Sequence, residues 1–277
     1  MNATAGPEPR VEMLRPHGRS YRHLEMIWGT AVTIDIREVD ERLPEDEFVR
    51  DAVEDAVEYM HWVDRVFSTH RPDTLVTALR TGRRSEADLS MRDGIEWAVL
   101  GVIEKCRAAR ELTDGAFDPW AVPGGFDPSG YVKGWAAEKV AGRLGRRGLA
   151  NVCVNAGGDV VTRGLAGPAE PWRVGIRHPD DAHSVVRTVE PGDGAVATSG
   201  PYERGAHIVD PRTGKPARGA RSASVIGPDA GLAEVLSTAL VVAGRDGVEW
   251  FAGLDGWEAF VVDPLPLDTA WSVRGTS

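Results

Sequence analysis

The sequence predicts an α+β fold in which helices flank mixed or antiparallel sheets. Residues 47–67 and 93–112 repeat apolar side chains at the spacing of amphipathic helices. In the C-terminal half, several short apolar segments follow one another, and most have no helical segment between them. Neighbouring strands of this kind favour antiparallel or mixed pairing over a doubly wound parallel sheet.

The expected strands are short and are bounded by Gly, Pro and polar residues. Residues 30–37 alternate between apolar and polar side chains, as in a strand with one buried face. Further strands are expected at residues 151–156, 172–176, 195–198, 206–209, 222–226 and 258–262. Two shorter helices are expected at residues 132–144 and 232–242.

The apolar residues of the two long helices mark the faces that are expected in the core. In the first helix they are Val49, Val53, Ala56, Val57, Met60, Val63 and Phe67. In the second helix they are Ile95, Val99, Val102, Ile103 and Cys106. Both cysteines, Cys106 and Cys153, lie in apolar patterns and are expected to be buried thiols. The lack of Cys/His ligand spacing argues against zinc and iron–sulfur sites.

Composition limits the classes of function. The chain has 277 residues and a formal net charge of −10, and an acidic surface argues against a general nucleic-acid binder. The N-terminus has no signal-peptide core, and no apolar segment approaches the ~20 residues that cross a bilayer. We therefore expect a cytoplasmic protein without a membrane span. Residues 1–22 are expected to be disordered or loosely ordered, residues 23–265 to form one domain and residues 266–277 to form a tail.

The common nucleotide-binding motifs are absent, since neither GxxxxGK[ST] nor a GxGxxG between a strand and a helix occurs. Residues 113–130 are instead crowded with Gly, Pro and Asp, which is typical of an ordered binding loop. Lys133 follows at the start of a helix, where its charge and the helix N-terminus suit a pyrophosphate. The alternative, a Gly/Pro-rich turn with a solvated lysine, remains open at this point.

Three other segments combine glycine or polar groups in a way that suits chemistry. The sequence NAGGD, residues 155–159, can admit a planar ring or simply reverse the chain. His207 has the chemistry of a general base near neutral pH, although a histidine in a strand is more often structural. Glu234 and Thr238 share one helical face, where their oxygens suit Mg²⁺. The alternative is an exposed Glu beside a Thr that packs its methyl group.

Together with residues 28–30 and 66–82, which have no specific chemistry alone, these segments resemble the FAD:protein FMN transferase family, also called ApbE. The resemblance covers about residues 28–262. Its most specific parts are TDGAFDP, SGYVKGWAAE, VNAGGD, ATSGPYERGAHIVDPRTGKP and AEVLSTAL. It implies an ApbE-like fold with two lobes that enclose an FAD cleft.

The resemblance implies an enzyme that transfers FMN from FAD to a Ser or Thr hydroxyl of an acceptor protein. The reaction is expected to require Mg²⁺, to form a phosphoester and to release AMP. Two related functions stay open: an FAD pyrophosphatase that yields FMN and AMP, and a non-catalytic flavin-binding protein. A structural or interaction domain would leave the Gly- and Asp-rich segments unexplained.

The resemblance also assigns roles to individual residues. His207 is the expected general base. The expected magnesium ligands are the carbonyl of Gly130 and the side chains of Glu234, Ser237 and Thr238. The residues expected to contact or surround FAD are Trp28, His70, Ala116, Phe117, Asp118, Asp127, Lys133, Gly157, Gly158 and Val209.

Three residues depart from the family pattern. Glu234 stands where the family usually has Asp, so its oxygens lie one methylene farther from the backbone. Trp28 replaces the usual Met and places an aromatic ring near the expected flavin, and Arg80 replaces a common Asn. Glu still ligates magnesium and Trp stacks on rings. We therefore expect altered affinity or metal preference at a site that is retained.

Overall fold

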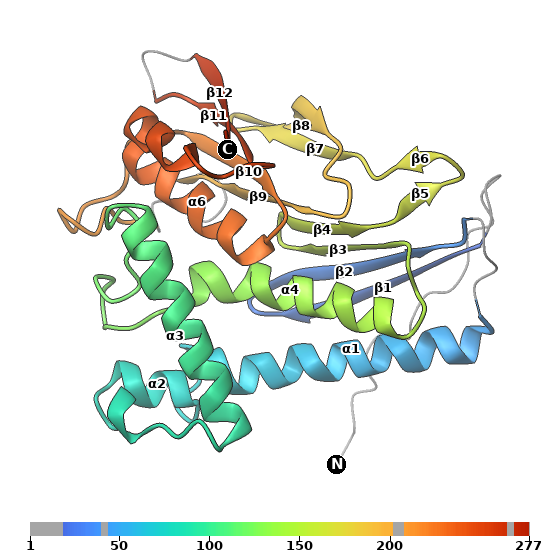
Figure 1. Ribbon diagram of the computed structural model, residues 1–277, viewed down its shortest axis with the longest axis horizontal. Coiled ribbons are helices and arrows are strands. Elements are labelled where there is room, and N and C mark those ends of the chain that lie inside the picture. Colours follow the sequence, from blue (N-terminus) through green and yellow to red (C-terminus); the bar gives the residue numbers. More distant parts are fainter. Residues whose placement is uncertain (1–18, 40–43, 202–207, 265–268, 277) are drawn as a thin grey trace.

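The main element of the fold is an eight-stranded sheet with the strand order β1-β2-β3-β4-β9-β10-β11-β12 (Figure 1). The structure is a computed structural model that describes residues 19–39, 44–201, 208–264 and 269–276. Each pair of neighbouring strands in the sheet is antiparallel. The predicted α+β class is therefore confirmed, with antiparallel pairing.

The strands of the sheet are short, as expected. They are β1 (Ser20–Ile27), β2 (Thr30–Arg37), β3 (Val152–Ala156), β4 (Asp159–Arg163), β9 (Ala195–Ser199), β10 (Ser222–Gly227), β11 (Glu258–Val262) and β12 (Ala270–Arg274). Two separate hairpins pair β5 (Leu165–Gly167) with β6 (Glu170–Pro171) and β7 (Val174–His178) with β8 (Asp181–Val189).

The helices are α1 (Asp46–Phe67), α2 (Leu75–Arg80), α3 (Gly94–Leu112), α4 (Ser129–Arg146) and α6 (Ala230–Ala243). Two 3₁₀ helices, η1 (Glu86–Asp88) and η2 (Gly244–Phe251), follow α2 and α6. Aspartates begin two of the α-helices. The Asp93 carboxylate accepts the amide of Ile95 at the start of α3, and Asp229 accepts that of Leu232 at the start of α6.

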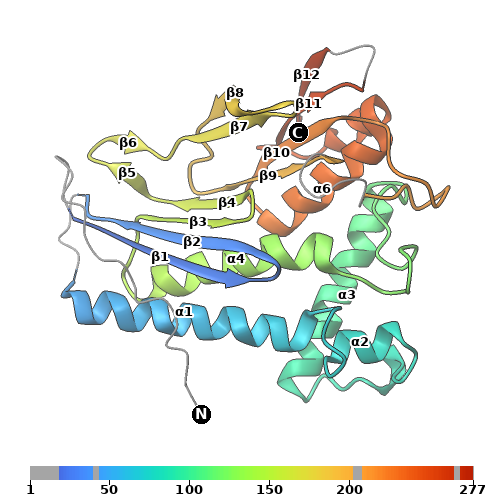
Figure 2. The same ribbon diagram turned by 180° about the vertical axis from the view of Figure 1, so that it is seen from behind.

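The helices form layers on one face of the sheet. Helix α4 packs on β3 and β4, and α6 packs on β9 and β10, while α1 lies beside α4 and against β1 (Figures 1 and 2). Val32, Ile34 and Ile36 of β2 are fully buried in the cluster that α1 and α4 also line. Since α4 and α6 also pack directly on each other, side chains from both helices meet beneath the middle of the sheet.

Most of the predicted elements are present. The helices expected at residues 47–67, 93–112 and 232–242 are α1, α3 and α6, and the segment between α3 and α4 is a loop. One predicted core position is wrong: Ile95 is 44% exposed, because it lies in the first turn of α3, before the buried face that begins at Val99.

The edges of the sheet extend beyond the expected domain limits. Strand β1 begins before residue 23, and β12 lies after residue 265 and pairs with β11. Residues 206 and 207 of the strand expected at 206–209 lie outside the described residues, and Val209 forms an isolated bridge with Pro216. Within the described ranges, no helix has the length and apolar character needed to cross a membrane.

One of the two cysteines is as buried as the sequence predicted, and the other is less buried. Cys106 is fully buried and Cys153 is half-buried, and both are free thiols. Burial raises the pKa of each thiol to about 12. Neither side chain is therefore a reactive thiolate near neutral pH.

Candidate functional site

Three charged side chains meet where β4, α4 and α6 come together. The ammonium of Lys133 on α4 lies 2.5 Å from Oδ2 of Asp159 on β4 and 3.4 Å from Oε1 of Glu234 on α6. Asp159 and Glu234 are both buried. Apart from this ion pair, Oδ2 of Asp159 has no hydrogen-bond partner among the described residues.

Gly134 allows α4 to approach α6 closely at this point. A Cβ on Gly134 would lie 2.3 Å from the carbonyl oxygen of Ala230 and 3.3 Å from Oε2 of Glu234. The amide of Gly134 donates a 2.8 Å hydrogen bond to that same Oε2. In a regular α-helix this amide bonds the carbonyl four residues back, which is that of Gly130. The Gly134 amide therefore has two possible acceptors, the Gly130 carbonyl and Oε2 of Glu234.

The site holds more buried negative charge than positive charge. Two carboxylates, Asp159 and Glu234, share the ammonium group of Lys133. Burial raises the pKa of Glu234 to about 7, the Lys133 ammonium opposes this rise and the Asp159 carboxylate adds to it. A buried carboxylate with insufficient countercharge is unfavourable. A bound divalent cation would supply the missing positive charge.

Hydroxyl groups adjoin Glu234 on α6. Ser199, at the end of β9, contacts Oγ of Ser237 at 2.8 Å and Oγ1 of Thr238 at 3.1 Å. Among the described side chains, no group of three or more His, Cys, Asp or Glu is arranged to hold a metal. A metal would therefore depend on carboxylate, hydroxyl and carbonyl oxygens together, which is a donor set that Mg²⁺ prefers. The residues present fit this ion.

Two turns lie side by side at the start of β2. Trp28 and Gly29 form the turn between β1 and β2, with φ values of 55° and 69°. A positive φ is unusual for a large side chain, and such strain tends to occur at functional sites. The buried Nε1 of Trp28 also has no hydrogen-bond partner among the described residues. Gly157 lies close by, since a Cβ there would be 2.4 Å from Oγ1 of Thr30.

Arg80, at the end of α2, fixes the loop before α4. Its guanidinium donates to Oδ2 of Asp127 at 3.0 Å and to the carbonyl of Pro123 at 2.5 Å. Gly124 has a φ of +90°, and a Cβ there would lie 2.6 Å from Nη2 of Arg80. Oδ1 of Asp127 accepts the amide of Ser129 at 3.0 Å. Both oxygens of Asp127 are thus engaged by groups that hold the loop and the start of α4.

The segment from Ala116 to Asp118 packs against the same loop. Ala116 and Phe117 are buried, and the Phe117 ring would lie 3.1 Å from a Cβ on Gly130. Asp118 accepts a 2.6 Å hydrogen bond from Nε of Arg110. The structure therefore brings Phe117 against Gly130.

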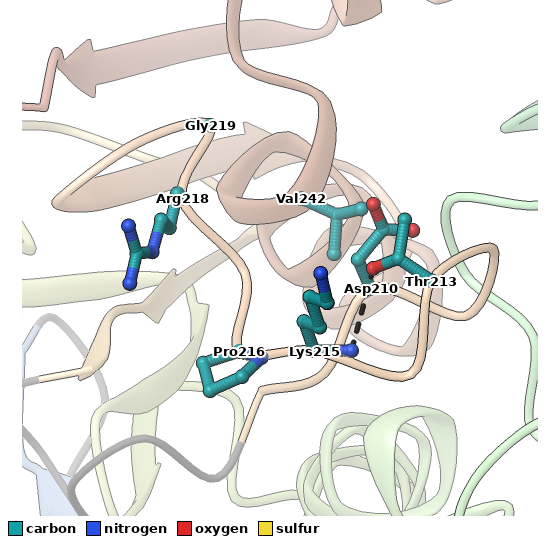
Figure 3. A pocket seen from close by; sticks show the side chains of 7 residues that line it. All are labelled: Asp210, Thr213, Lys215, Pro216, Arg218, Gly219 and Val242. Atoms are coloured by element: carbon teal, nitrogen blue, oxygen red, sulfur yellow. Dashed lines mark hydrogen bonds between the residues drawn. The ribbon is translucent and has the colours of Figure 1, made fainter.

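A groove of about 590 Å³ lies farther along α6 (Figure 3). Val242, four residues after Thr238 and so on the same helical face, is one of its lining residues. The others come from the segment after β9, and they are Asp210, Thr213, Lys215, Pro216, Arg218 and Gly219. The residues that line the groove are thus distinct from Lys133, Asp159 and Glu234.

The ApbE family model matches residues 121–261, which is just over half of the chain. The chain belongs to the ApbE family. The ApbE segment contains Lys133, Asp159 and Glu234, so the charged site lies entirely within it.

Comparisons with individual proteins also find similarity to members of the ApbE family. The FAD:protein FMN transferase of Vibrio cholerae is 38% identical to this chain over 130 residues, which are 43% of this chain and 39% of that protein. The chain thus matches less than half of the length of this relative. The solved structure of the flavin transferase ApbE from Vibrio cholerae has a TM-score of 0.77 and 22% identity, and the comparison covers 94% of this chain and 98% of that one. The ApbE protein from Thermotoga maritima has a TM-score of 0.76 and 26% identity, covering 92% and 97%. These likenesses establish the ApbE fold.

The structure gathers some of the expected site residues and not others. Lys133 contacts Glu234, and Ser237 and Thr238 follow Glu234 on α6. His70 is exposed, and its described contact is a 3.4 Å hydrogen bond from its amide to Ser68. His207, the expected base, lies outside the described residues.

Sequence reasoning gave no role to two residues of this site, Gly134 and Ser199, and it placed Asp159 only in a turn near the expected cofactor. Each lies within one of the segments that carried the family resemblance. The sequence gives no sign of the contacts that these residues make, because their partners are distant in the chain.

Proposed function

We propose that this chain transfers the FMN half of FAD to a Ser or Thr hydroxyl of an acceptor protein, with release of AMP. The relatives named FAD:protein FMN transferase support this activity. The observation that carries the proposal is the buried site of Lys133, Asp159 and Glu234. It lies within the matched segment and has an excess of negative charge that a cation would balance.

Mg²⁺ would be held by oxygens of α4 and α6. The donors are the Gly130 carbonyl and the side chains of Glu234, Ser237 and Thr238. When bound, Mg²⁺ supplies electrostatic stabilisation to a phosphoryl group and its leaving group. The longer Glu234 side chain suits this arrangement, because it spans the gap to α4 and accepts the Gly134 amide.

Lys133 would bind and orient the pyrophosphate of FAD. Its ammonium is partly exposed while its charge is held in place by Asp159. The aromatic ring of Trp28, held in a strained turn beside Gly157, would contact the flavin.

His207 would accept the proton of the acceptor hydroxyl while the hydroxyl oxygen attacks the FMN-side phosphorus. The bond between that phosphorus and the bridging oxygen breaks, and AMP leaves with the electron pair. Support for this role is the family resemblance of the surrounding segment. We expect the acceptor to meet this chain in the cytoplasm.

The test is an incubation of the purified protein with FAD and Mg²⁺, with and without an acceptor that carries a candidate flavinylation sequence. AMP release and acceptor mass are followed together. Transfer predicts AMP only when the acceptor gains the mass of an FMN phosphoester. AMP with free FMN would instead identify a pyrophosphatase, and bound intact FAD would identify a flavin-binding protein.

A further inference from the structure

Ser199 connects β9 to the two hydroxyl residues of α6. Its side chain lies on the same face of β9 as the buried Ala197, toward α6. Its Oγ contacts Oγ of Ser237 at 2.8 Å and Oγ1 of Thr238 at 3.1 Å. Ser237 in turn donates to the backbone carbonyl of Glu234 at 2.9 Å. Three hydroxyl groups thus form a short chain that ends on the helix backbone.

When all three hydrogen bonds form together, each hydroxyl donates its one proton only once, and this leaves a single direction for the chain. The proton of Ser237 goes to the Glu234 carbonyl, which can only accept. Ser199 is therefore the donor in its bond with Ser237. Its proton is then committed, so Thr238 is the donor in the remaining bond.

The consequence concerns the oxygen of Thr238. Its proton points toward Ser199, so its lone pairs are directed elsewhere. A hydroxyl oxygen binds a hard cation through its lone pairs, and a proton pointing at the ion would oppose binding. We propose that Ser199 is a positioning residue that orients the Thr238 hydroxyl for the cation of this site. The proposal rests on the proposed metal site and adds to it a residue that would not itself touch the ion.

The test measures metal binding directly, by calorimetry with Mg²⁺ and by electron paramagnetic resonance with Mn²⁺, on the full chain without FAD. Ser199→Ala is expected to weaken the Kd by ~10–100-fold, the range seen when groups that orient metal ligands are removed. Thr198→Val is the matched control. Thr198 lies next in the same strand and bonds Ser224 at 2.8 Å instead of α6. This control removes one hydroxyl from β9, together with its hydrogen bond to Ser224, and should leave the Kd unchanged.

A double-mutant cycle separates positioning from a general structural effect. If Ser199 acts through Thr238, then Ser199→Ala should add little to the loss caused by Thr238→Val. Equal binding by wild type and Ser199→Ala, or additive losses in the double variant, would overturn the proposal. Should Ser199→Ala not fold, Ser199→Cys keeps the volume, weakens the hydrogen bonds and takes its place in the same comparison.

The wild-type titration keeps this proposal distinct from the proposed function. Wild type that binds neither Mg²⁺ nor Mn²⁺ would overturn both the metal site and the role of Ser199. Wild type that binds the ion while Ser199→Ala binds it equally well would overturn the role of Ser199 alone.

Discussion

The backbone amide of Gly134 donates a 2.8 Å hydrogen bond to the Glu234 carboxylate, 100 residues away in the sequence. This contact fixes the distance between α4 and α6 and places Glu234 beside Lys133. It also requires glycine, since any side chain at position 134 would collide with the backbone of α6. The candidate site therefore depends on helix packing as much as on its charged residues.

Gly134→Ala should damage both stability and the site. The added Cβ would lie 2.3 Å from the Ala230 carbonyl oxygen, so α4 and α6 would have to separate. We expect a loss of ~1–3 kcal/mol in the free energy of unfolding, together with weaker Mg²⁺ binding. Gly145→Ala on the same helix is the control, because a Cβ there meets nothing within 4 Å. This control should be neutral or stabilising by up to ~1 kcal/mol, and equal losses in both variants would refute the packing argument.

The raised pKa of Glu234 predicts a loss of stability as pH rises. Its ordinary value is 4.5 and its pKa in the folded protein is about 7, so the folded state holds this proton more tightly than the unfolded state. The resulting stabilisation is full below about pH 4.5 and is lost as pH rises through about 7. Urea unfolding at several pH values in this range measures the slope of the free energy of unfolding against pH. Glu234→Gln should flatten it, whereas an unchanged slope would show that Glu234 does not cause it.

The same titration predicts how metal binding depends on pH. Mg²⁺ requires the ionised carboxylate, so its affinity should rise as pH increases through about 7. Glu234→Gln should bind Mg²⁺ weakly at every pH. Calorimetric titrations at several pH values test both points, and a pH-independent affinity in wild type would contradict the assignment of Glu234 as a ligand.

Arg80→Ala should weaken FAD binding without altering the contacts among Lys133, Asp159 and Glu234. The variant loses the hydrogen bonds to Asp127 and Pro123 that hold the loop before α4. We expect ~1–3 kcal/mol less stability, because hydrogen bonds from a charged group are lost, and a higher KM for FAD. Arg83→Ala is the control, since its exposed guanidinium bonds the Pro72 carbonyl outside this loop. An unchanged KM in Arg80→Ala would contradict a role for Arg80 in the site.

His207→Ala should separate catalysis from binding. A general base typically contributes ~10²–10⁴-fold to the rate, so transfer should fall by this factor while FAD affinity stays close to that of wild type. Transfer rates and FAD affinity, measured on the same preparation, test the prediction. Normal transfer by this variant would remove His207 from the mechanism.

Periodicity predicted the helices well, because a continuous apolar face marks α1 as strongly in the sequence as in the structure. Periodicity did not predict β1, because this strand has polar residues on its inward-facing side and apolar residues on its exposed side. His23 and Glu25 share the inward-facing side of this strand with Tyr21, while Leu24 and Met26 are exposed on the other side. The inward polar groups are satisfied by each other and by His61 of α1, a tertiary contact that no local pattern reveals.

The sequence indicated which segments contain the candidate site, but it did not predict the contacts between those segments. Glu234 and Thr238 could be paired because helix geometry relates residues four apart. Asp159 could not be linked to Lys133, since their contact depends on how α4 lies against β4. The hydrogen bond from Arg80 to Asp127 could not be predicted either, because α2 and the loop meet only in the folded chain.

The most direct test of FMN transfer uses FAD labelled with ³²P in one phosphate at a time, in a single turnover with an acceptor protein and Mg²⁺. Attack on the FMN-side phosphorus predicts that label in this phosphate becomes covalently bound to the acceptor. Label in the other phosphate should leave entirely as AMP. Both labels should stay in FAD when Glu234→Gln replaces wild type. FMN-side label that ends in free FMN, or that never leaves FAD, would contradict transfer.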